Sequence, residues 1–91
     1  MRIVRLSTKA GKAAQSLPLP VQTALWFLVG DLKLKGPVAG SWPNYSKLDR
    51  DRHHCHIKKG RPTYVAIWRE VGDEAKTIEV TYVGTHEKAP Y

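Results

Sequence analysis

Apolar residues in the first third of the chain recur at helical spacing. Residues 2–6 form a short candidate strand, and Ser7 is suited to cap a helix because its hydroxyl can accept a hydrogen bond from an unpaired N–H of the first turn. Apolar side chains then recur from Ala10 to Leu17 on one helix face. The pattern predicts a strand over 2–6 and a helix over roughly 8–17.

A second helix is predicted after a corner that contains two prolines. Pro18 and Pro20 interrupt the first helix, and Pro20 also suits the first turn of the next helix, where its missing N–H is not needed. Gly36-Pro37 ends this second helix. Its buried face is expected to consist of Val21, Ala24, Leu25, Leu28, Val29 and Leu32. The two helices should therefore form a helical hairpin.

The pattern changes from helical to alternating in the second half of the chain. Residues 37–52 have no clear period and are rich in loop-forming residues, so we expect a loop there. The strands predicted after this loop cover 53–58, 63–69 and 77–83, and the turns between them cover 59–62 and 71–75.

These elements predict an α+β fold with the order βααβββ. We expect a small antiparallel sheet with the N-terminal helical hairpin packed on one face. Residues 1–91 should form a single domain, because a second core in so short a chain would be too small to be stable. The residues expected to be largely buried are Val21, Leu25, Leu28, Leu32, Cys55 and Ile57.

The charge of the chain favours a polyanionic partner. Fifteen Lys and Arg residues against eight Asp and Glu residues give a formal net charge of +7. A basic surface binds nucleic acid because each neutralised phosphate releases counterions. A merely solubilising surface would also explain the charge, but it would not explain why the basic residues cluster as described below.

Composition also bears on location and redox state. No window of about 18 apolar residues is present, so no membrane span is expected. The segment Met1–Arg5 lacks the long apolar stretch of a signal peptide, and we expect a cytoplasmic protein. Cys55 is the only cysteine, so an intramolecular disulfide cannot form.

The predicted strand over 53–58 is the segment richest in chemistry. Side chains alternate across a sheet, so Cys55 and Ile57 should face the helices while His54, His56 and Lys58 share the open face. The basic residues that flank this strand are Arg50, Arg52, Lys59 and Arg61. The open face should therefore carry imidazoles that titrate near neutral pH within a basic surface.

Such a face suits cleavage of RNA without a metal ion. A general base removes the proton of a ribose 2′-OH, the oxygen attacks the adjacent phosphate, and a general acid protonates the departing 5′-oxygen. Histidine suits both roles because its unperturbed pKa is about 6.5. Arginine and lysine stabilise the charge of the transition state. We predict His54 and His56 as catalytic residues, and Arg50, Arg52, Lys58, Lys59 and Arg61 as RNA- and phosphate-binding residues.

Three other interpretations stay open for this strand. The histidines can be ordinary polar surface, or the patch can bind nucleic acid without cutting it. His54 and His56 can also chelate a metal, with His86 or Glu87 as a third ligand. The spacing is short and unspecific, and the surrounding cations oppose metal binding, so we expect neither a metal nor another cofactor.

Two further segments are candidates for function. The run that contains Trp26 and Phe27 is apolar on more than one helix face, which indicates either a buried helix or a binding site for a protein partner. The segment 84–91 follows the last predicted strand and carries His86 and Tyr91, which are candidates for acid–base chemistry or base stacking.

Several short segments resemble the RelE/ParE superfamily of bacterial toxins. Ser-x-Lys-Ala at 7–10 and Leu17-Pro18 are similar to the start of these toxins, and Tyr45–Leu48 through His54–Gly60 resembles their central basic strand and its turn. Tyr82–His86 looks like the last strand and the histidine-bearing tail of the RelE and HigB branch.

The resemblance implies a ribosome-dependent endoribonuclease that cleaves mRNA in the ribosomal A site and is neutralised by a cognate antitoxin that wraps the toxin. The residues that match the family's catalytic positions are His54, His56, Lys58, Arg61, His86 and Tyr91, with the base and the acid unassigned. Two alternatives share the fold: a noncatalytic binding module, and an inhibitor of DNA gyrase like the ParE branch. The polar tail favours the nuclease branch.

Overall fold

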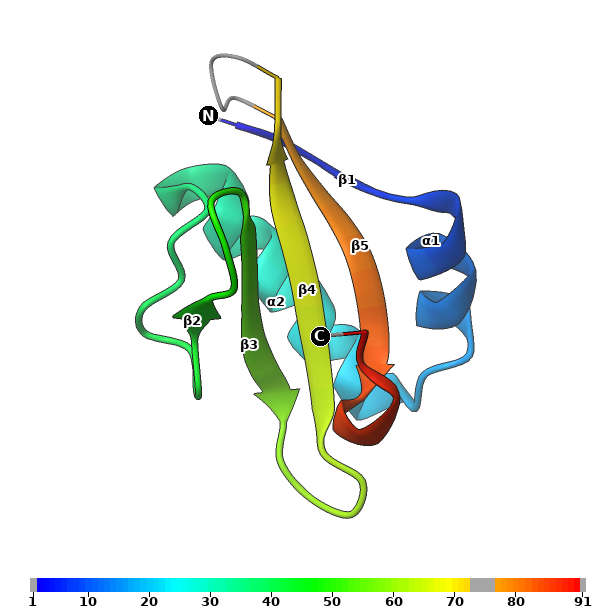
Figure 1. Cartoon of the computed structure of the whole chain (residues 1–91). Coiled ribbons are helices and arrows are strands. Elements are labelled where there is room, and N and C mark those ends of the chain that lie inside the picture. The colour runs from blue at the N-terminus through cyan, green and yellow to red at the C-terminus, as the bar shows by residue number, and fades with distance from the viewer. Residues whose placement is uncertain (1, 73–76, 91) are drawn as a thin grey trace.

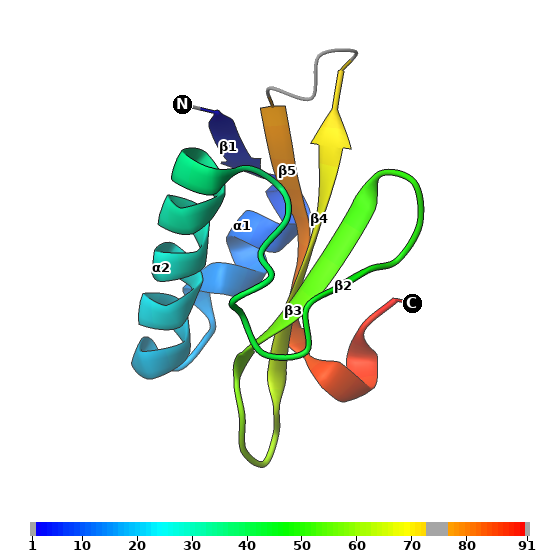
Figure 2. The ribbon, with the colours of Figure 1, turned by 90° about the vertical axis from the view of Figure 1, so that its left-hand side faces the viewer.

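The computed structural model describes residues 2–72 and 77–90, and it consists of a five-stranded sheet with two helices on one face (Figures 1 and 2). The strands are β1 (Ile3–Leu6), β2 (Ser46–Lys47), β3 (Arg52–Lys58), β4 (Tyr64–Val71) and β5 (Thr77–Thr85). The helices are α1 (Thr8–Gln15), α2 (Leu19–Lys35) and the short 3-10 helix η1 (His86–Lys88). The α+β class and the helical hairpin on one face are confirmed.

The sheet is mixed, and the prediction that it is antiparallel was wrong for one strand. The strand order is β1-β5-β4-β3-β2, and β1 runs parallel to β5 with Ile3 opposite Thr77, whereas the other neighbours are antiparallel. β2 lies within the region predicted as a loop. The parallel pair joins segments that are distant in sequence, and β2 has only two residues, which are too few to show an alternation of side chains.

The helices begin and end where the chain supplies capping groups. The Ser7 hydroxyl accepts a hydrogen bond from the Ala10 N–H at 3.1 Å, which confirms the predicted cap of α1. α2 has Pro20 in its first turn and ends at Gly36, whose φ of +93° favours glycine. A side chain at Gly36 would also collide with the guanidinium of Arg2, 2.8 Å from the position of a Cβ.

The core lies between the helical hairpin and the sheet. All six residues predicted to be buried are at most 7% exposed, and Leu25, Leu28, Leu32 and Cys55 are 0% exposed. Burial in this apolar environment raises the pKa of the Cys55 thiol to about 12. Trp68 on β4 is also fully buried, and its indole N–H donates to the Pro37 carbonyl at 2.9 Å. This bond holds the segment after α2 against the sheet.

The C-terminal residues lie on the opposite side of the sheet from the helical hairpin (Figure 2). η1 follows β5 directly, and the chain then crosses in front of β4 (Figure 1). This arrangement brings η1 to the open face of the sheet, where the sequence places His54 and His56. Among residues 2–72 and 77–90, no helix has the length and apolar character needed to cross a membrane.

The two faces of α2 give a test of this packing. Leu28 is 0% exposed and Leu34 is 70% exposed on the same helix. Leu28→Ala should lower the free energy of unfolding by about 2–5 kcal/mol, because it leaves a cavity in the core. Leu34→Ala should change it by less than about 0.5 kcal/mol. Urea denaturation measures both values, and equal losses for the two variants would contradict the packing.

Candidate functional site

Three histidines meet on the open face of the sheet. His54 and His56 alternate with the buried residues of β3, and η1 places the exposed His86 beside them. The ring centroids of His54 and His56 are 6.2 Å apart, and those of His56 and His86 are 5.4 Å apart, with the rings edge-on in both pairs. The predicted orientation of β3 is therefore confirmed, and the tail histidine joins the strand histidines.

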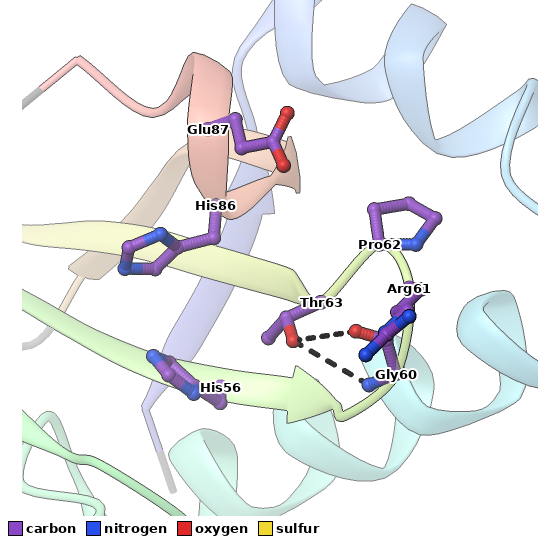
Figure 3. A pocket seen from close by; sticks show the side chains of 7 residues that line it. All are labelled: His56, Gly60, Arg61, Pro62, Thr63, His86 and Glu87. Carbon is purple, nitrogen blue, oxygen red and sulfur yellow. Dashed lines mark hydrogen bonds between the residues drawn. The ribbon is translucent and has the colours of Figure 1, made fainter.

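An open cavity of about 720 Å³ lies beside this cluster (Figure 3). The turn between β3 and β4 forms one wall, and η1 forms another (Figure 3). The lining residues are His56, Gly60, Arg61, Pro62, Thr63, His86 and Glu87. The cavity thus combines two imidazoles, a guanidinium and a carboxylate.

Backbone and side-chain hydrogen bonds fix the walls of this cavity. The Thr63 hydroxyl donates to the Gly60 carbonyl at 3.0 Å and accepts from the Gly60 N–H at 3.4 Å, which holds the turn in place. The Gly60 backbone has a φ of +151°, which favours glycine. The His86 N–H donates to the Thr63 carbonyl at 2.8 Å. This last bond connects the tail directly to the turn across the cavity.

β2 and the segment before it position the strand histidines. The His54 Nδ1 lies 2.9 Å from the Ser46 hydroxyl oxygen and 3.4 Å from the Ser46 carbonyl oxygen. The His56 backbone N–H donates to the Pro43 carbonyl at 2.8 Å. The sequence reasoning missed Ser46 as a functional residue because residues 37–52 show no strand period. The sequence feature that could have indicated Ser46 is its position in the segment Tyr45–Leu48, which resembles the toxin family.

The environment of His56 favours its neutral form. Burial lowers the pKa of His56, and repulsion from His86, His54 and Lys59 lowers this pKa further. The apolar side chains of Val65 and Ile67 lie opposite His56 and His54 in the β3–β4 pair, and both are at most 1% exposed. The neutral His56 imidazole can therefore accept a proton near neutral pH.

The other predicted site residues divide into two groups. Arg61 lines the cavity, and the exposed Lys58 and Lys59 lie at the end of β3 that leads into the turn. Arg52 is the first residue of β3 and Arg50 precedes the strand, so Arg52 lies about 20 Å from Lys58 by the rise of a strand. The guanidinium of Arg52 also pairs with Asp49, with an Nε–Oδ2 distance of 2.7 Å. Tyr91 lies outside the described residues.

His53 belongs to the core and not to the site. It is 1% exposed, its Nε2 lies 2.8 Å from a Glu70 carboxylate oxygen, and its Nδ1 lies 2.7 Å from the Tyr45 hydroxyl. Its ring stacks on Tyr45 and Trp68, each at a centroid distance of 5.9 Å. These contacts satisfy both ring nitrogens of a buried polar side chain. His53 thus anchors β3 from the inner side.

Trp26 and Phe27 lie on α2, which covers the opposite face of the sheet. They are 53% and 69% exposed, and they line a shallow cavity of about 300 Å³ together with Thr23. Of the two interpretations of this apolar run, the buried helix is wrong for these two residues.

No group of three or more His, Cys, Asp or Glu side chains within residues 2–72 and 77–90 is arranged to hold a metal ion.

Comparisons with known proteins identify the fold. No protein-family model matches the chain, and no curated protein is similar to it in sequence. The crystal structure of the isolated E. coli RelE toxin matches with a TM-score of 0.72 and 18% identity, over 99% of this chain and 89% of that chain. The archaeal RelE–RelB complex from Pyrococcus horikoshii OT3 matches with a TM-score of 0.71 and 16% identity, over 97% and 98%. The intact E. coli RelBE toxin–antitoxin complex matches with a TM-score of 0.71 and 18% identity, over 97% and 100%.

The chain therefore has a RelE-like toxin fold, as the short sequence segments implied. The match extends over nearly the whole chain. At this level of identity the match defines the fold, and a fold alone does not define the chemistry of a site.

Titration of His56 tests the electrostatics of the site. We expect its pKa in the free protein to lie below the usual value near 6.5, because of burial and of the neighbouring cations. His86→Gln should raise the pKa of His56, because one repelling group is removed. NMR of the imidazole protons against pH measures both values. A His56 pKa that does not rise in this variant would contradict the coupling, and Lys88→Gln on the same helix serves as the control.

Proposed function

We propose that this protein is the toxin of a toxin–antitoxin pair and that it cleaves mRNA on the ribosome without a metal ion. The observation that carries the proposal is the His54, His56 and His86 cluster beside an open cavity lined by Arg61. The net charge of +7 favours a nucleic-acid substrate. The RelE-like fold supports the proposal, because two of the similar structures are complexes of a RelE toxin with RelB.

The proposed reaction uses the histidines as base and acid. One imidazole takes the proton of a ribose 2′-OH, and the oxygen attacks the adjacent phosphorus while the bond to the 5′-oxygen breaks. A second imidazole, protonated beforehand, gives its proton to that 5′-oxygen. The products are a 2′,3′-cyclic phosphate and a 5′-hydroxyl. His56 and His86 are our first choice for these roles, with the order unassigned.

The basic residues act on the phosphate in this proposal. Arg61 is placed to stabilise the charge of the transition state because it lines the cavity with His56 and His86. The exposed Lys58 and Lys59 adjoin the turn and suit contacts with the neighbouring phosphates. We assign Arg50 and Arg52 to the outer part of the RNA path. Tyr91, in the tail, is assigned to acid–base chemistry or to base stacking.

Two alternative functions remain on this fold. The same basic face suits a noncatalytic module that binds nucleic acid or a protein partner, and the ParE branch of the resembling superfamily inhibits DNA gyrase. The cluster of proton carriers favours the nuclease, because neither alternative requires an acid and a base beside a cavity. Breaks in mRNA distinguish the nuclease from both alternatives, and poisoning of gyrase distinguishes the two alternatives from each other.

Cleavage of ribosome-bound mRNA is the central test. Purified protein should produce new breaks in mRNA on ribosomes, and the breaks should persist with a chelator of transition metals at a magnesium concentration that keeps the ribosomes intact. His86→Gln should lower the rate about 10²–10⁴-fold, because it removes a positioned proton carrier. Its binding to ribosomes should stay nearly unchanged. Primer extension maps the breaks, and co-sedimentation measures binding.

Each outcome of this test has a defined meaning. If the protein makes no breaks, the nuclease is wrong, and poisoning of gyrase would then favour the ParE-like alternative. If the chelator abolishes cleavage, metal independence is wrong. If His86→Gln cuts as fast as the parent protein, the assignment of His86 is wrong. Lys88→Gln is the matched control, because Lys88 is exposed on η1 and does not line the cavity.

The proposed antitoxin should be acidic and should bind the exposed apolar face of α2. Trp26 and Phe27 are candidate anchors, because large exposed apolar side chains contribute most of the affinity of many interfaces. Phe27→Ala should weaken binding of the antitoxin by about 30-fold or more. Higher salt should slow association, because opposite charges steer the encounter. Biosensor kinetics measure both effects.

The partner for this measurement is the proposed antitoxin, which we expect to be a small acidic protein encoded by a neighbouring gene. Val38→Ala is the matched control, because Val38 is apolar and 60% exposed but lies outside α2. Equal effects of the two substitutions would contradict the assigned face. A gene with no such neighbour, in a host that tolerates free expression, would favour the binding module.

A further inference from the structure

The three histidines of the site form a continuous row. His56 stands in the middle, with its ring centroid 6.2 Å from that of His54 and 5.4 Å from that of His86. Charges at such separations repel each other when the site is partly shielded from water. A proton on His54 or on His86 therefore disfavours a proton on His56, which lies between them.

The charges around the row are mainly positive. The ionisable groups on this face come from β3, from the turn after it, from β5 and from η1, and they are Lys58, Lys59, Arg61, Tyr82 and Glu87. Farther along the same face, Arg52 pairs with Asp49, and Arg69 on β4 pairs with Glu79. β4 supplies the uncharged Val65 and Ile67 opposite His56 and His54. The Glu87 carboxylate extends to the other side of η1 from the His86 ring (Figure 3).

Burial and neighbouring positive charges disfavour a proton on His56 in the free protein. Burial lowers the pKa of His56, and His86, His54 and Lys59 lower it further. A phosphodiester in the cavity would reverse this effect, because a nearby anion favours the imidazolium form. The protein would then bind a proton together with the anion, and the proton would come from the solvent.

We propose that the row of His54, His56 and His86 is a proton-linked receptor for the nucleic-acid backbone, so that binding of the strand itself draws a proton onto the row. This inference rests on the proposed function, because the protonated ring is the acid that the cleavage step needs. The free protein favours neutral His56, and binding of the substrate would draw from the solvent the proton that the acid needs. Binding of the strand would thus produce the combination of one neutral and one protonated imidazole that cleavage needs.

The sign of the pH dependence follows from this linkage. The complex holds more protons than the free protein and the free strand together, so affinity rises as pH falls. Uptake of one proton raises the affinity about tenfold for each unit of pH over the range where the free row is unprotonated and the bound row is protonated. The gain ends at lower pH, where the free protein also becomes protonated.

Calorimetric titration measures this proton uptake directly. The probe is a single-stranded 2′-O-methyl RNA, which carries the phosphates but lacks the attacking hydroxyl. The binding enthalpy is measured at pH 7 and constant ionic strength in Pipes and in Tris, which differ in their heat of protonation. We expect net proton uptake when the strand binds, and a dissociation constant that falls by up to about tenfold for each unit of pH as the pH is lowered from 8 to 6.

Two variants assign the uptake to the row. His56→Gln should remove most of the uptake, and His86→Gln, at an exposed position, should lower it without risk to the fold. Lys88→Gln should weaken binding only slightly and should leave the uptake unchanged. Urea denaturation confirms that each variant is folded.

Binding without proton uptake, uptake that persists in both histidine variants, or no binding of the probe would each overturn the proposal. These results are separable from the fate of the nuclease. Proton uptake by a protein that makes no breaks in mRNA supports the receptor and refutes the nuclease. Cleavage without proton uptake does the opposite.

Discussion

The alternation of side chains along β3 is the constraint on which both the core and the site depend. Cys55 and Ile57 are drawn into the core by the hydrophobic effect, and His53 is held there by hydrogen bonds at both ring nitrogens. His54 and His56 must then point to the open face. A shift of one residue would bury these two histidines and expose the core residues of the strand. The stability of the core therefore also orients the histidines.

Local patterns predicted the elements that form from neighbouring residues. Helical spacing gave both helices, the Ser7 hydroxyl gave the cap of α1, and alternation gave the buried face of β3. The parallel pairing of β1 with β5 could not be predicted, because the residue pattern of a four-residue strand does not indicate which strand it pairs with. β2 was predicted as part of a loop because its two residues are too few to show an alternation of side chains.

The candidate site was predictable in part for the same reasons. His54 and His56 followed from alternation, whereas His86 was selected only for its chemistry and for the resemblance of the tail to known toxins. Its position beside His56 depends on the bond from its N–H to Thr63, which no pattern in the sequence indicates. Ser46 was not predicted because its role depends on a contact with His54 on the neighbouring strand. Contacts between segments thus decide which residues of a predicted set work together.

The bond between His86 and Thr63 also has a consequence for synthesis. It joins two walls of the cavity that are separated by all of β4 and β5, so the cavity cannot exist before translation has passed the last strand. The apolar surface of α2 is made much earlier, in the first half of the chain. A nascent chain therefore exposes its apolar helix face to binding proteins while its histidine row is still incomplete. For a protein proposed to attack translation, this order delays activity until η1 has left the ribosome that makes the chain.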